Sequence, residues 1–319
     1  MDRDIASVAI IGAGTMGLGV AECFAVAGVR VFVTDATPEL ARQAIGRLRQ
    51  RVRGHVDAGL LPADALDRAA TVEAADDIAA TVRDCDLVFE AAPEDLALKQ
   101  TVLRAIAAAA RPDAIIATNT SSLPIDDLAP AVTGPERFLG MHWFNPPEWT
   151  PGVEVIPGAA TAPEVVARVK AFLLATGKRP AVVRSAPCFV ANRIQNALFR
   201  EAMACVEEGL ATPAEVDEVV RSTFGFRLPF FGPFQIADMA GLDVYASVFG
   251  TMERELGPAW RAPDLLREQV AQGRIGTKGG AGFYTYDDAT RDRLLIERDR
   301  RYAALNRLLA EFPPITPPD

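Results

Sequence analysis

One histidine and one glutamate are spaced so that they could share a proton. His142 ends an apolar run, FLGMHW, and Glu154 lies in the next apolar run, VEVI. If these runs pair as antiparallel strands, with Glu148 at the midpoint of the loop between them, the two side chains become cross-strand neighbours on one face. The carboxylate would fix the imidazole tautomer, so the pair could act as a general base. The alternative is a His–Glu contact that only holds two strands together.

Further polar side chains stand where a ligand could meet them. The segment TNTSS, with Ser121, follows the apolar run 114–117, and the C-terminal ends of strands carry ligands in open α/β sheets. Asn192 opens a helical pattern and could donate its amide to a substrate oxygen. The plainer interpretations are a polar turn at 118–122 and a polar contact between domains at Asn192. The second histidine, His55, lies in an Arg-rich helical stretch and is expected on the surface.

A glycine motif predicts a dinucleotide site. Residues 12–17, GAGTMG, match G-x-G-x-x-G between an apolar strand and a helical pattern, and they supply Gly12, Gly14, Thr15, Met16 and Gly17. Asp35 ends the next strand-like run, where a carboxylate can hold the ribose 2′-hydroxyl. Ala36 follows it, and no arginine is adjacent to receive a 2′-phosphate, which favours NAD over NADP. A base at His142 would then take the hydroxyl proton of an alcohol while its hydride passes to NAD.

These residues need a sheet to position them. Apolar runs predict strands at 5–11, 29–34, 71–73, 86–91, 114–118, 137–143, 153–156 and 181–184, and helical patterns such as 38–60 separate most of them. This alternation predicts an α/β fold with a Rossmann-type, doubly wound, mainly parallel sheet. From 187 onward the patterns are helical, at 189–209, 213–223, 234–250, 262–272 and 290–311, around a glycine-rich loop at 273–286. We therefore expect an NAD-binding domain at 1–185 and an all-helical domain at 186–319.

Composition excludes several classes of partner. The chain has 33 Lys and Arg against 42 Asp and Glu, a net charge of −9, which disfavours nucleic acid and anionic membranes. No apolar run is long enough to span a membrane, and the acidic start does not resemble a signal peptide. Four isolated cysteines offer no metal-binding spacing. We expect a cytoplasmic protein with no metal.

At this point the motifs together resemble the 3-hydroxyacyl-CoA dehydrogenase family over residues 5–286. Their order and spacing are more specific than any one of them. They are GAGTMG at 12–17, EAAPEDLALK at 90–99, TNTSSL at 118–123, GMHWFNPP at 140–147, VEVI at 153–156, FVANRI at 189–194, GPFQIADMAGLD at 232–243 and GRIGTKGGAGFYTY at 273–286.

The resemblance implies roles for single residues. His142 would be the general base with Glu154 as its partner, and Ser121 and Asn192 would contact the substrate oxygen. Dinucleotide-binding positions would be Asp35, Glu94, Lys99, Ser121, Asn145 and Lys278. The reaction would be the reversible oxidation of a short-chain (S)-3-hydroxyacyl thioester by NAD. The helical domain would form a homodimer.

The chain departs from the family around its substrate. The loop after His142 reads PEWTPG, and the family's CoA-contacting Ser and Lys have no clear match near 51–58. Several segments look more like the relatives that oxidise CoA-free 3-hydroxy acids, L-gulonate dehydrogenase (lambda-crystallin) and carnitine dehydrogenase. A CoA-free substrate is therefore the second hypothesis, and a non-catalytic crystallin-like or NAD-sensing protein the third. Trp143, Glu148 and Trp149 are the first candidates for substrate contacts.

Overall fold

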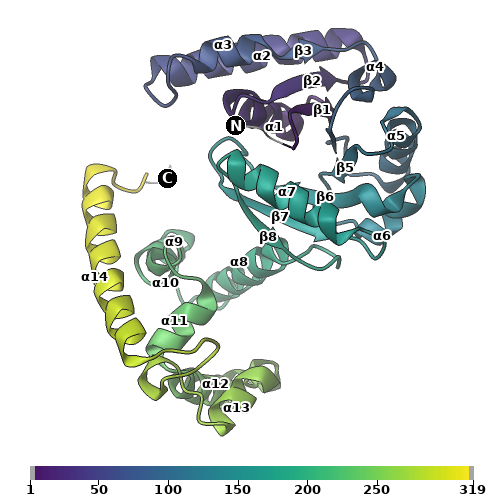
Figure 1. The fold of residues 1–319 in the computed structure, drawn as a ribbon. Coiled ribbons are helices and arrows are strands. Elements are labelled where there is room, and N and C mark those ends of the chain that lie inside the picture. Colours follow the sequence, from purple (N-terminus) through teal and green to yellow (C-terminus); the bar gives the residue numbers. More distant parts are fainter. Residues whose placement is uncertain (1–3, 316–319) are drawn as a thin grey trace. The chain divides into compact units, whose positions relative to one another are not determined.

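The computed structural model describes residues 4–315, which form two compact units (Figure 1). The division falls between Ala197 and Leu198, inside the helix α8 (Ala191–Glu207). The last strand ends at Val182, close to the predicted domain boundary at 185. The division between the units falls later in the chain than residue 185 because the first turn of α8 is hydrogen-bonded to the first unit, as described below.

The first unit is built on a single sheet of eight strands, in the order β3-β2-β1-β4-β5-β6-β7-β8. All neighbouring pairs are parallel except β6 and β7, which are antiparallel. The strands are β1 (Ser7–Ile11), β2 (Arg30–Thr34), β3 (Glu73–Ala74), β4 (Leu87–Glu90), β5 (Ile115–Thr118), β6 (Phe138–Trp143), β7 (Gly152–Pro157) and β8 (Arg179–Val182). This is the predicted doubly wound sheet, with strand ends that differ from the predicted runs by a few residues.

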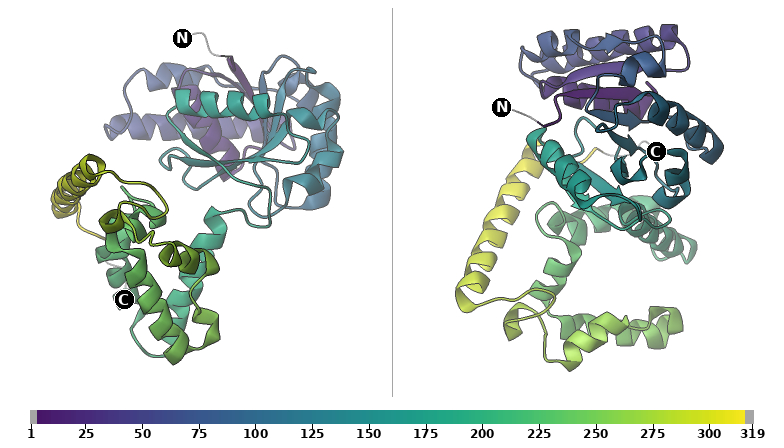
Figure 2. Two further views of the ribbon diagram at one scale, coloured as in Figure 1. Left: turned by 60° about the horizontal axis from the view of Figure 1, so that its bottom comes forward. Right: turned by 45° about the vertical axis from the view of Figure 1, so that its right-hand side comes forward.

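Helices cover both faces of this sheet, as the two views of Figure 2 show. The side chains of Ile10 and Phe89 lie in one core with residues of α1 (Thr15–Val26), α2 (Pro38–Asp57) and α7 (Pro163–Ala175). Their neighbours Ile11 and Val88 lie in a second core with residues of α4 (Ile78–Val82), α5 (Leu96–Ala109) and α6 (Ile125–Leu128). The near-continuous apolar runs are explained by burial on both faces.

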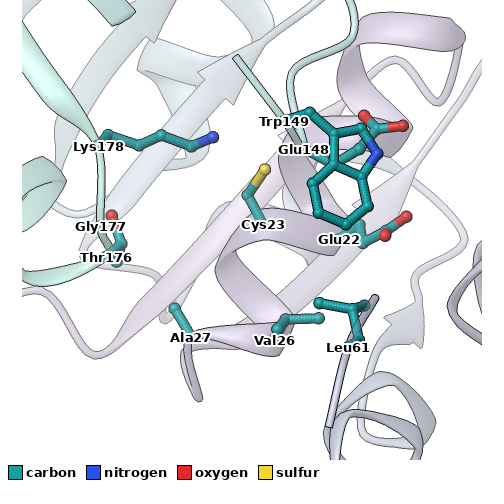
Figure 3. Close-up of a pocket in the computed structure, with 10 residues that line it drawn as sticks. All are labelled: Glu22, Cys23, Val26, Ala27, Leu61, Glu148, Trp149, Thr176, Gly177 and Lys178. Atoms are coloured by element: carbon teal, nitrogen blue, oxygen red, sulfur yellow. The ribbon is translucent and has the colours of Figure 1, made fainter. Parts of the chain in front are cut away.

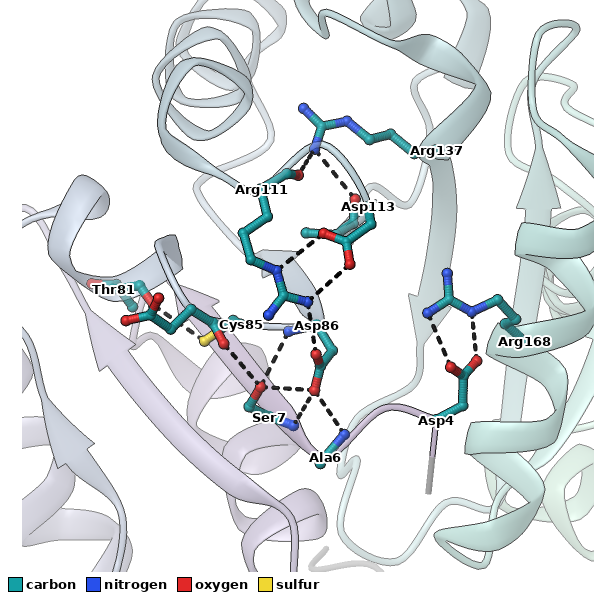
Figure 4. A network of polar contacts seen from close by, with 12 residues as sticks. Asp4, Ala6, Ser7, Thr81, Cys85, Asp86, Arg111, Asp113, Arg137 and Arg168 are labelled. Carbon is teal, nitrogen blue, oxygen red and sulfur yellow. Dashed lines mark hydrogen bonds and ion pairs between the residues drawn. The ribbon is translucent and has the colours of Figure 1, made fainter. Parts of the chain in front are cut away.

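The N-terminal ends of the central strands are pinned by a polar network (Figure 4). Asp86 Oδ2 accepts hydrogen bonds from the backbone N–H groups of Ala6 and Ser7 and from the Ser7 hydroxyl, each at 2.9 Å. Arg111 donates to Asp86 Oδ1 at 2.9 Å. Burial would raise the pKa of Asp86, but these hydrogen bonds outweigh it and hold the pKa below its usual range. The network fixes the start of β1 to the start of β4.

The second unit is helical. It contains α9 (Pro213–Ser222), α10 (Phe224–Arg227), α11 (Pro233–Ala240), α12 (Leu242–Leu256), α13 (Asp264–Ala271) and the long yellow helix α14 (Asp288–Glu311). The single helix predicted over 234–250 is in fact two helices, since Gly241 has a φ of 104°, outside the helical region. Within residues 4–315 no helix combines the length and the apolar character that crossing a bilayer requires.

Candidate active site

The predicted pairing of His142 with Glu154 is present in the structure. The two residues face each other in the antiparallel register of β6 and β7. His142 Nδ1 lies 2.8 Å from Glu154 Oε2, and both side chains are buried. Because a carboxylate only accepts, Nδ1 carries the proton and Nε2 presents its lone pair. Among residues 4–315, the hydrogen bond of the imidazole to Glu154 is made through Nδ1, which leaves Nε2 on the other side of the ring.

The other oxygen of Glu154 is held by the start of α8. Its Oε1 accepts the backbone N–H groups of Val190 at 3.1 Å and Ala191 at 2.9 Å. These donors are the backbone N–H groups that the first turn of a helix leaves without a partner inside the helix. Both oxygens of Glu154 are therefore held by hydrogen bonds, and the carboxylate in turn fixes the orientation of the His142 ring.

Two aromatic rings enclose the imidazole. Phe144 and Phe189 have ring centroids 4.5 Å and 5.7 Å from that of His142. Phe189 is buried, and both it and Cys188 have positive φ, 49° and 61°. Such backbone angles are uncommon outside glycine and cluster at functional sites. The sequence gives no sign of this turn, and Phe189 was not predicted as a site residue.

Ser121 and Asn192 are brought to the same place. Asn192 Nδ2 donates to the backbone oxygen of Ser121 at 3.0 Å, which ties the loop after β5 to the first turn of α8. Since the same turn holds Glu154, the predicted residues form one connected group in the first unit. In the same region, the Asn119 side chain accepts the backbone N–H of Trp143 at 3.1 Å and so links the loop to the end of β6.

The glycine loop lies between β1 and α1 as predicted. A Cβ on Gly17 would lie 1.9 Å from the backbone oxygen of Gly12, so the loop closes only without a side chain. A Cβ on Gly14 would meet nothing within 4 Å, so the protein itself does not require glycine there. Gly14 is the N-cap of α1, and no side chain caps this helix. Open space beside free helix N–H groups fits a diphosphate.

Asp35 supports this loop from the end of β2. Its Oδ2 accepts the N–H of Ala13 at 2.7 Å and its Oδ1 accepts the N–H of Ala36 at 2.6 Å. The carboxylate borders a cavity of about 840 Å³ at the C-terminal ends of β1, β2, β4 and β5. This is the edge of the sheet at which such folds bind dinucleotides.

The lining of this cavity contains most of the predicted cofactor residues. Described residues that line it include Gly12, Gly14, Thr15, Met16, Asp35, Glu94 and Ser121, and none of the described lining residues is Lys or Arg. A 2′-phosphate would therefore meet Asp35 without a compensating cation.

Glu94 organises the serine loop. Its Oε1 accepts from the hydroxyls of Thr120 and Ser122, at 2.7 Å and 2.8 Å, and from the N–H groups of Ser121 and Ser122, at 2.9 Å each. Burial acts to raise the pKa of Glu94, but these hydrogen bonds and the charge of Lys99 outweigh it, so the pKa lies below its ordinary value. Glu94 thus lines the cavity and also fixes the loop at residues 120–122 through its hydrogen bonds.

Four predicted cofactor residues are not among the described residues of the cavity lining. One is Gly17, which closes the glycine loop, and the others are Lys99, Asn145 and Lys278. Lys99 is fully buried and donates to Glu90 and to the backbone oxygen of Ala92, so it lies behind the cavity wall. Asn145 is exposed in the loop after β6. Lys278 belongs to the second unit, where its Nζ donates to Asp243 at 2.8 Å. A cofactor contact of Asn145 or Lys278 stays a prediction.

The prediction that Trp143 contacts substrate is wrong. Successive residues of a strand point to opposite faces, so Trp143 faces away from its neighbour His142. Its ring packs against Phe24 at 5.4 Å and Phe89 at 6.3 Å in the core below α1 and α7. The indole is a core residue.

Glu148 and Trp149 line a different pocket, of about 240 Å³ (Figure 3). Lys178 lies in the same pocket, and its Nζ donates to the backbone oxygens of Pro147 and Thr150 at 2.6 Å and 3.1 Å. Neither Glu148 nor Trp149 lines the cavity at the glycine loop, and a contact of either residue with substrate stays a prediction.

Arg51 forms ion pairs with two glutamates beside this pocket. It donates to the buried carboxylate of Glu22 at 2.5 Å and lies 3.9 Å from Glu148. His55, expected on the surface, is only partly exposed; its Nδ1 lies 3.0 Å from Glu22, and its ring lies edge-on to Trp149 at 5.2 Å. The Arg-rich helix therefore uses this arginine to hold the protein's own acids.

Comparison with known proteins agrees with the geometry. Sequence profiles described as "3-hydroxyacyl-CoA dehydrogenase, NAD binding domain" and "3-hydroxyacyl-CoA dehydrogenase, C-terminal domain" match residues 7–186 and 189–286. A 5-formyl-3-hydroxy-2-methylpyridine 4-carboxylate 5-dehydrogenase of Mesorhizobium japonicum is 36% identical over 96% of this chain and 98% of its own. A probable 3-hydroxybutyryl-CoA dehydrogenase of Bacillus subtilis is 34% identical over 90% and 99%.

A solved structure shares the fold. The crystal structure of a 3-hydroxyacyl-CoA dehydrogenase from Archaeoglobus fulgidus has a TM-score of 0.79 at 32% identity, covering 96% of this chain and 99% of that one.

Proposed function

Because the chain belongs to the 3-hydroxyacyl-CoA dehydrogenase family of NAD-dependent oxidoreductases, we propose that it oxidises the 3-hydroxyl of a short-chain (S)-3-hydroxyacyl-CoA thioester to the ketone. His142 is the general base in this proposal and Glu154 its orienting partner. The observation that carries it is the 2.8 Å contact between His142 Nδ1 and Glu154 Oε2, with Nε2 left to face a substrate.

The residues divide the work of the reaction. NAD, when bound, supplies the acceptor for the hydride that leaves the carbon of the alcohol. His142 Nε2 takes the hydroxyl proton, and Glu154 stabilises the imidazolium that results. In this proposal the Ser121 hydroxyl and the Asn192 amide donate to the substrate oxygen as it becomes a carbonyl.

The chain's own residues fit the dinucleotide. The N-terminus of α1 and the open side of Gly14 receive the diphosphate, and Asp35 receives the ribose hydroxyls.

A CoA-free substrate is the second candidate, and one observation favours it. Arg51, a cation of the helix α2 that could meet a CoA phosphate, is bound to Glu22 and lies near Glu148. The Mesorhizobium japonicum relative, named for a pyridine carboxylate substrate, also matches nearly the whole chain. In this second proposal the chemistry at His142 is the same, and the substrate is a hydroxylated acid without a thioester.

A substrate panel separates these candidates. NADH formation is measured with (S)-3-hydroxybutyryl-CoA and with the free acids gulonate and carnitine. We expect turnover of the thioester with NAD and much less with NADP. Turnover of the free acids alone would replace the first candidate by the second. A third outcome is that the protein binds NADH, but His142→Gln leaves its rate of substrate oxidation unchanged or no oxidation is detected at all. The protein is then a non-catalytic NAD-binding relative.

We further propose a homodimer formed through the helical unit. Apolar side chains of this unit stand exposed in the single chain, at Leu198, Phe199 and Met203 of α8 and at Val244 and Val248 of α12. Exposed apolar surface of this kind marks an interface. Sedimentation of the wild type against Phe199→Glu tests it, because a charge at such an interface should produce monomers. The proposed location is the cytoplasm.

A further inference from the structure

A buried lysine binds the loop that connects β6 to β7. Lys178 immediately precedes β8 and is only 7% exposed. Its Nζ donates to the backbone oxygens of Pro147 and Thr150, at 2.6 Å and 3.1 Å, and lies 5.2 Å from the centre of the Trp143 ring. Among residues 4–315, the hydrogen bonds of this ammonium therefore go to neutral carbonyl groups.

Neutral partners are a costly environment for an ammonium. Removing a charge from water costs free energy, which a paired carboxylate would return in part. Two acids line the same pocket, but Glu22 is paired with Arg51, and Glu148 lies 3.9 Å from the same arginine. An apolar side chain at the start of β8 would avoid this cost, so the stability of the strand does not explain the lysine.

The backbone of the loop shows why a donor is needed there. Within the loop, two N–H groups donate to the backbone oxygen of Pro146, which leaves the carbonyl groups of Pro147 and Thr150 to other donors. A buried carbonyl without a donor is unfavourable. The Pro147 oxygen accepts the thiol of Cys23, at 3.3 Å, in addition to the ammonium. Figure 3 shows the Lys178 side chain extending toward this thiol.

The same loop contacts both the imidazole and α1. Its first residue, Phe144, has its ring centroid 4.5 Å from that of His142. A Cβ on Gly19 of α1 would lie 2.3 Å from Pro147 Cγ, so the loop lies directly on the backbone of the helix. The ammonium thus holds the loop at the residue that meets α1, a short way along the chain from the ring beside His142.

We propose that Lys178 is a positioning residue of the reaction centre. It holds the loop at residues 144–151 against α1 and thereby keeps Phe144 packed against His142. Lys178 acts through the loop and touches no reacting atom. The inference rests on the proposed function, in which His142 is the general base.

The test replaces Lys178 by methionine, which removes the charge and the donors but keeps a long side chain. The kcat for (S)-3-hydroxybutyryl-CoA with NAD should fall by about tenfold to a hundredfold, because a misplacement of about 1 Å can cost on the order of 100-fold. The Kd for NADH should keep its wild-type value, because Lys178 does not line the cavity at the glycine loop. Amide hydrogen exchange of residues 144–151 should become faster.

A matched control separates positioning from stability. Val169 of α7 is 0% exposed, so Val169→Ala should lower the unfolding midpoint and leave kcat and the exchange of residues 144–151 unchanged. The proposal is overturned if Lys178→Met keeps the wild-type kcat, if it loses no more than Val169→Ala, or if kcat falls without faster exchange in the loop.

A second variant tests the same contact from the side of the helix. Gly19→Ala favours the helical backbone of α1, but its Cβ would displace Pro147. If Lys178→Met does not fold, this variant decides: kcat should fall and the Kd for NADH should not change, whereas a wild-type kcat would overturn the proposal.

The results separate the two levels of inference. A wild type that does not oxidise the thioester would refute the proposed function, while hydrogen exchange of residues 144–151 would still decide whether Lys178 holds the loop. An active wild type beside an equally active Lys178→Met would refute only the positioning role.

Discussion

Replacing Glu154 by glutamine tests the chemistry of the site with the smallest change of shape. The carboxylate accepts three hydrogen bonds, one from His142 Nδ1 and two from the N–H groups of Val190 and Ala191. Glutamine can keep its oxygen on the two backbone N–H groups. Its amide nitrogen then faces His142 and can only donate.

The consequence is a change of tautomer. Nδ1 must now accept, so the proton moves to Nε2, the nitrogen that should take the proton of the substrate. General-base help is worth ~10²–10⁴-fold, which corresponds to about 3–5 kcal/mol of transition-state stabilisation. We expect kcat to fall by this factor. Stability should change little, because all three contacts survive with one of them reversed.

The assay is steady-state NADH formation with saturating NAD, together with NADH titration and denaturant unfolding of the same preparation. The expected pattern is a large loss in kcat, an unchanged Kd for NADH and an unchanged unfolding midpoint. A kcat within about tenfold of the wild type would refute the reasoning, since it lies below the general-base range. A large loss of stability would mean that Glu154 serves the fold.

Four further outcomes are expected. His142→Gln should lower kcat steeply with little change in the Kd for NADH; a protein that no longer folds would mark the histidine as structural. Asp35→Ser should raise KM for NAD and reduce discrimination against NADP, and an unaltered cofactor preference would count against the ribose contact. Gly14→Ala should fold normally and bind NADH weakly, whereas Gly17→Ala should destabilise the fold, since its Cβ would lie 1.9 Å from the Gly12 oxygen; equal effects of the two in unfolding and titration would contradict the loop geometry. Because the pKa of Asp86 is lowered in the folded protein, its contribution to stability is fully present above the ordinary value of 3.8 and declines as the pH falls through the lower folded value; Asp86→Asn should show a flatter dependence of unfolding free energy on pH in that range, and parallel curves would exclude the contribution.

Local spacing was enough to predict the centre of the site. The pairing of His142 with Glu154 follows from one short antiparallel connection, whose register is set by where the loop turns. The glycine loop and Asp35 belong to one strand–helix–strand unit, so their positions also follow from neighbouring segments.

Contacts between distant elements could not be predicted in this way. Glu90 meets Lys99 and Thr118 only after a helix and a further strand have packed beside it. Arg51 finds Glu22 across two helices, and nothing in the Arg-rich pattern distinguishes it from its neighbours. Trp143 is a different case. Because successive side chains of a strand point to opposite faces of the sheet, the sequence already places Trp143 on the face away from His142. The prediction of a substrate contact relied on its aromatic character and its position beside His142.

The helix that crosses from the first unit to the second carries a mechanical implication. α8 runs without a break from Ala191 to Glu207, its first turn grips Glu154, and the units divide at Ala197. Asn192 of the same turn also holds the backbone oxygen of Ser121. A substitution that unwinds this turn would therefore release the acid beside the imidazole and the loop after β5 at once.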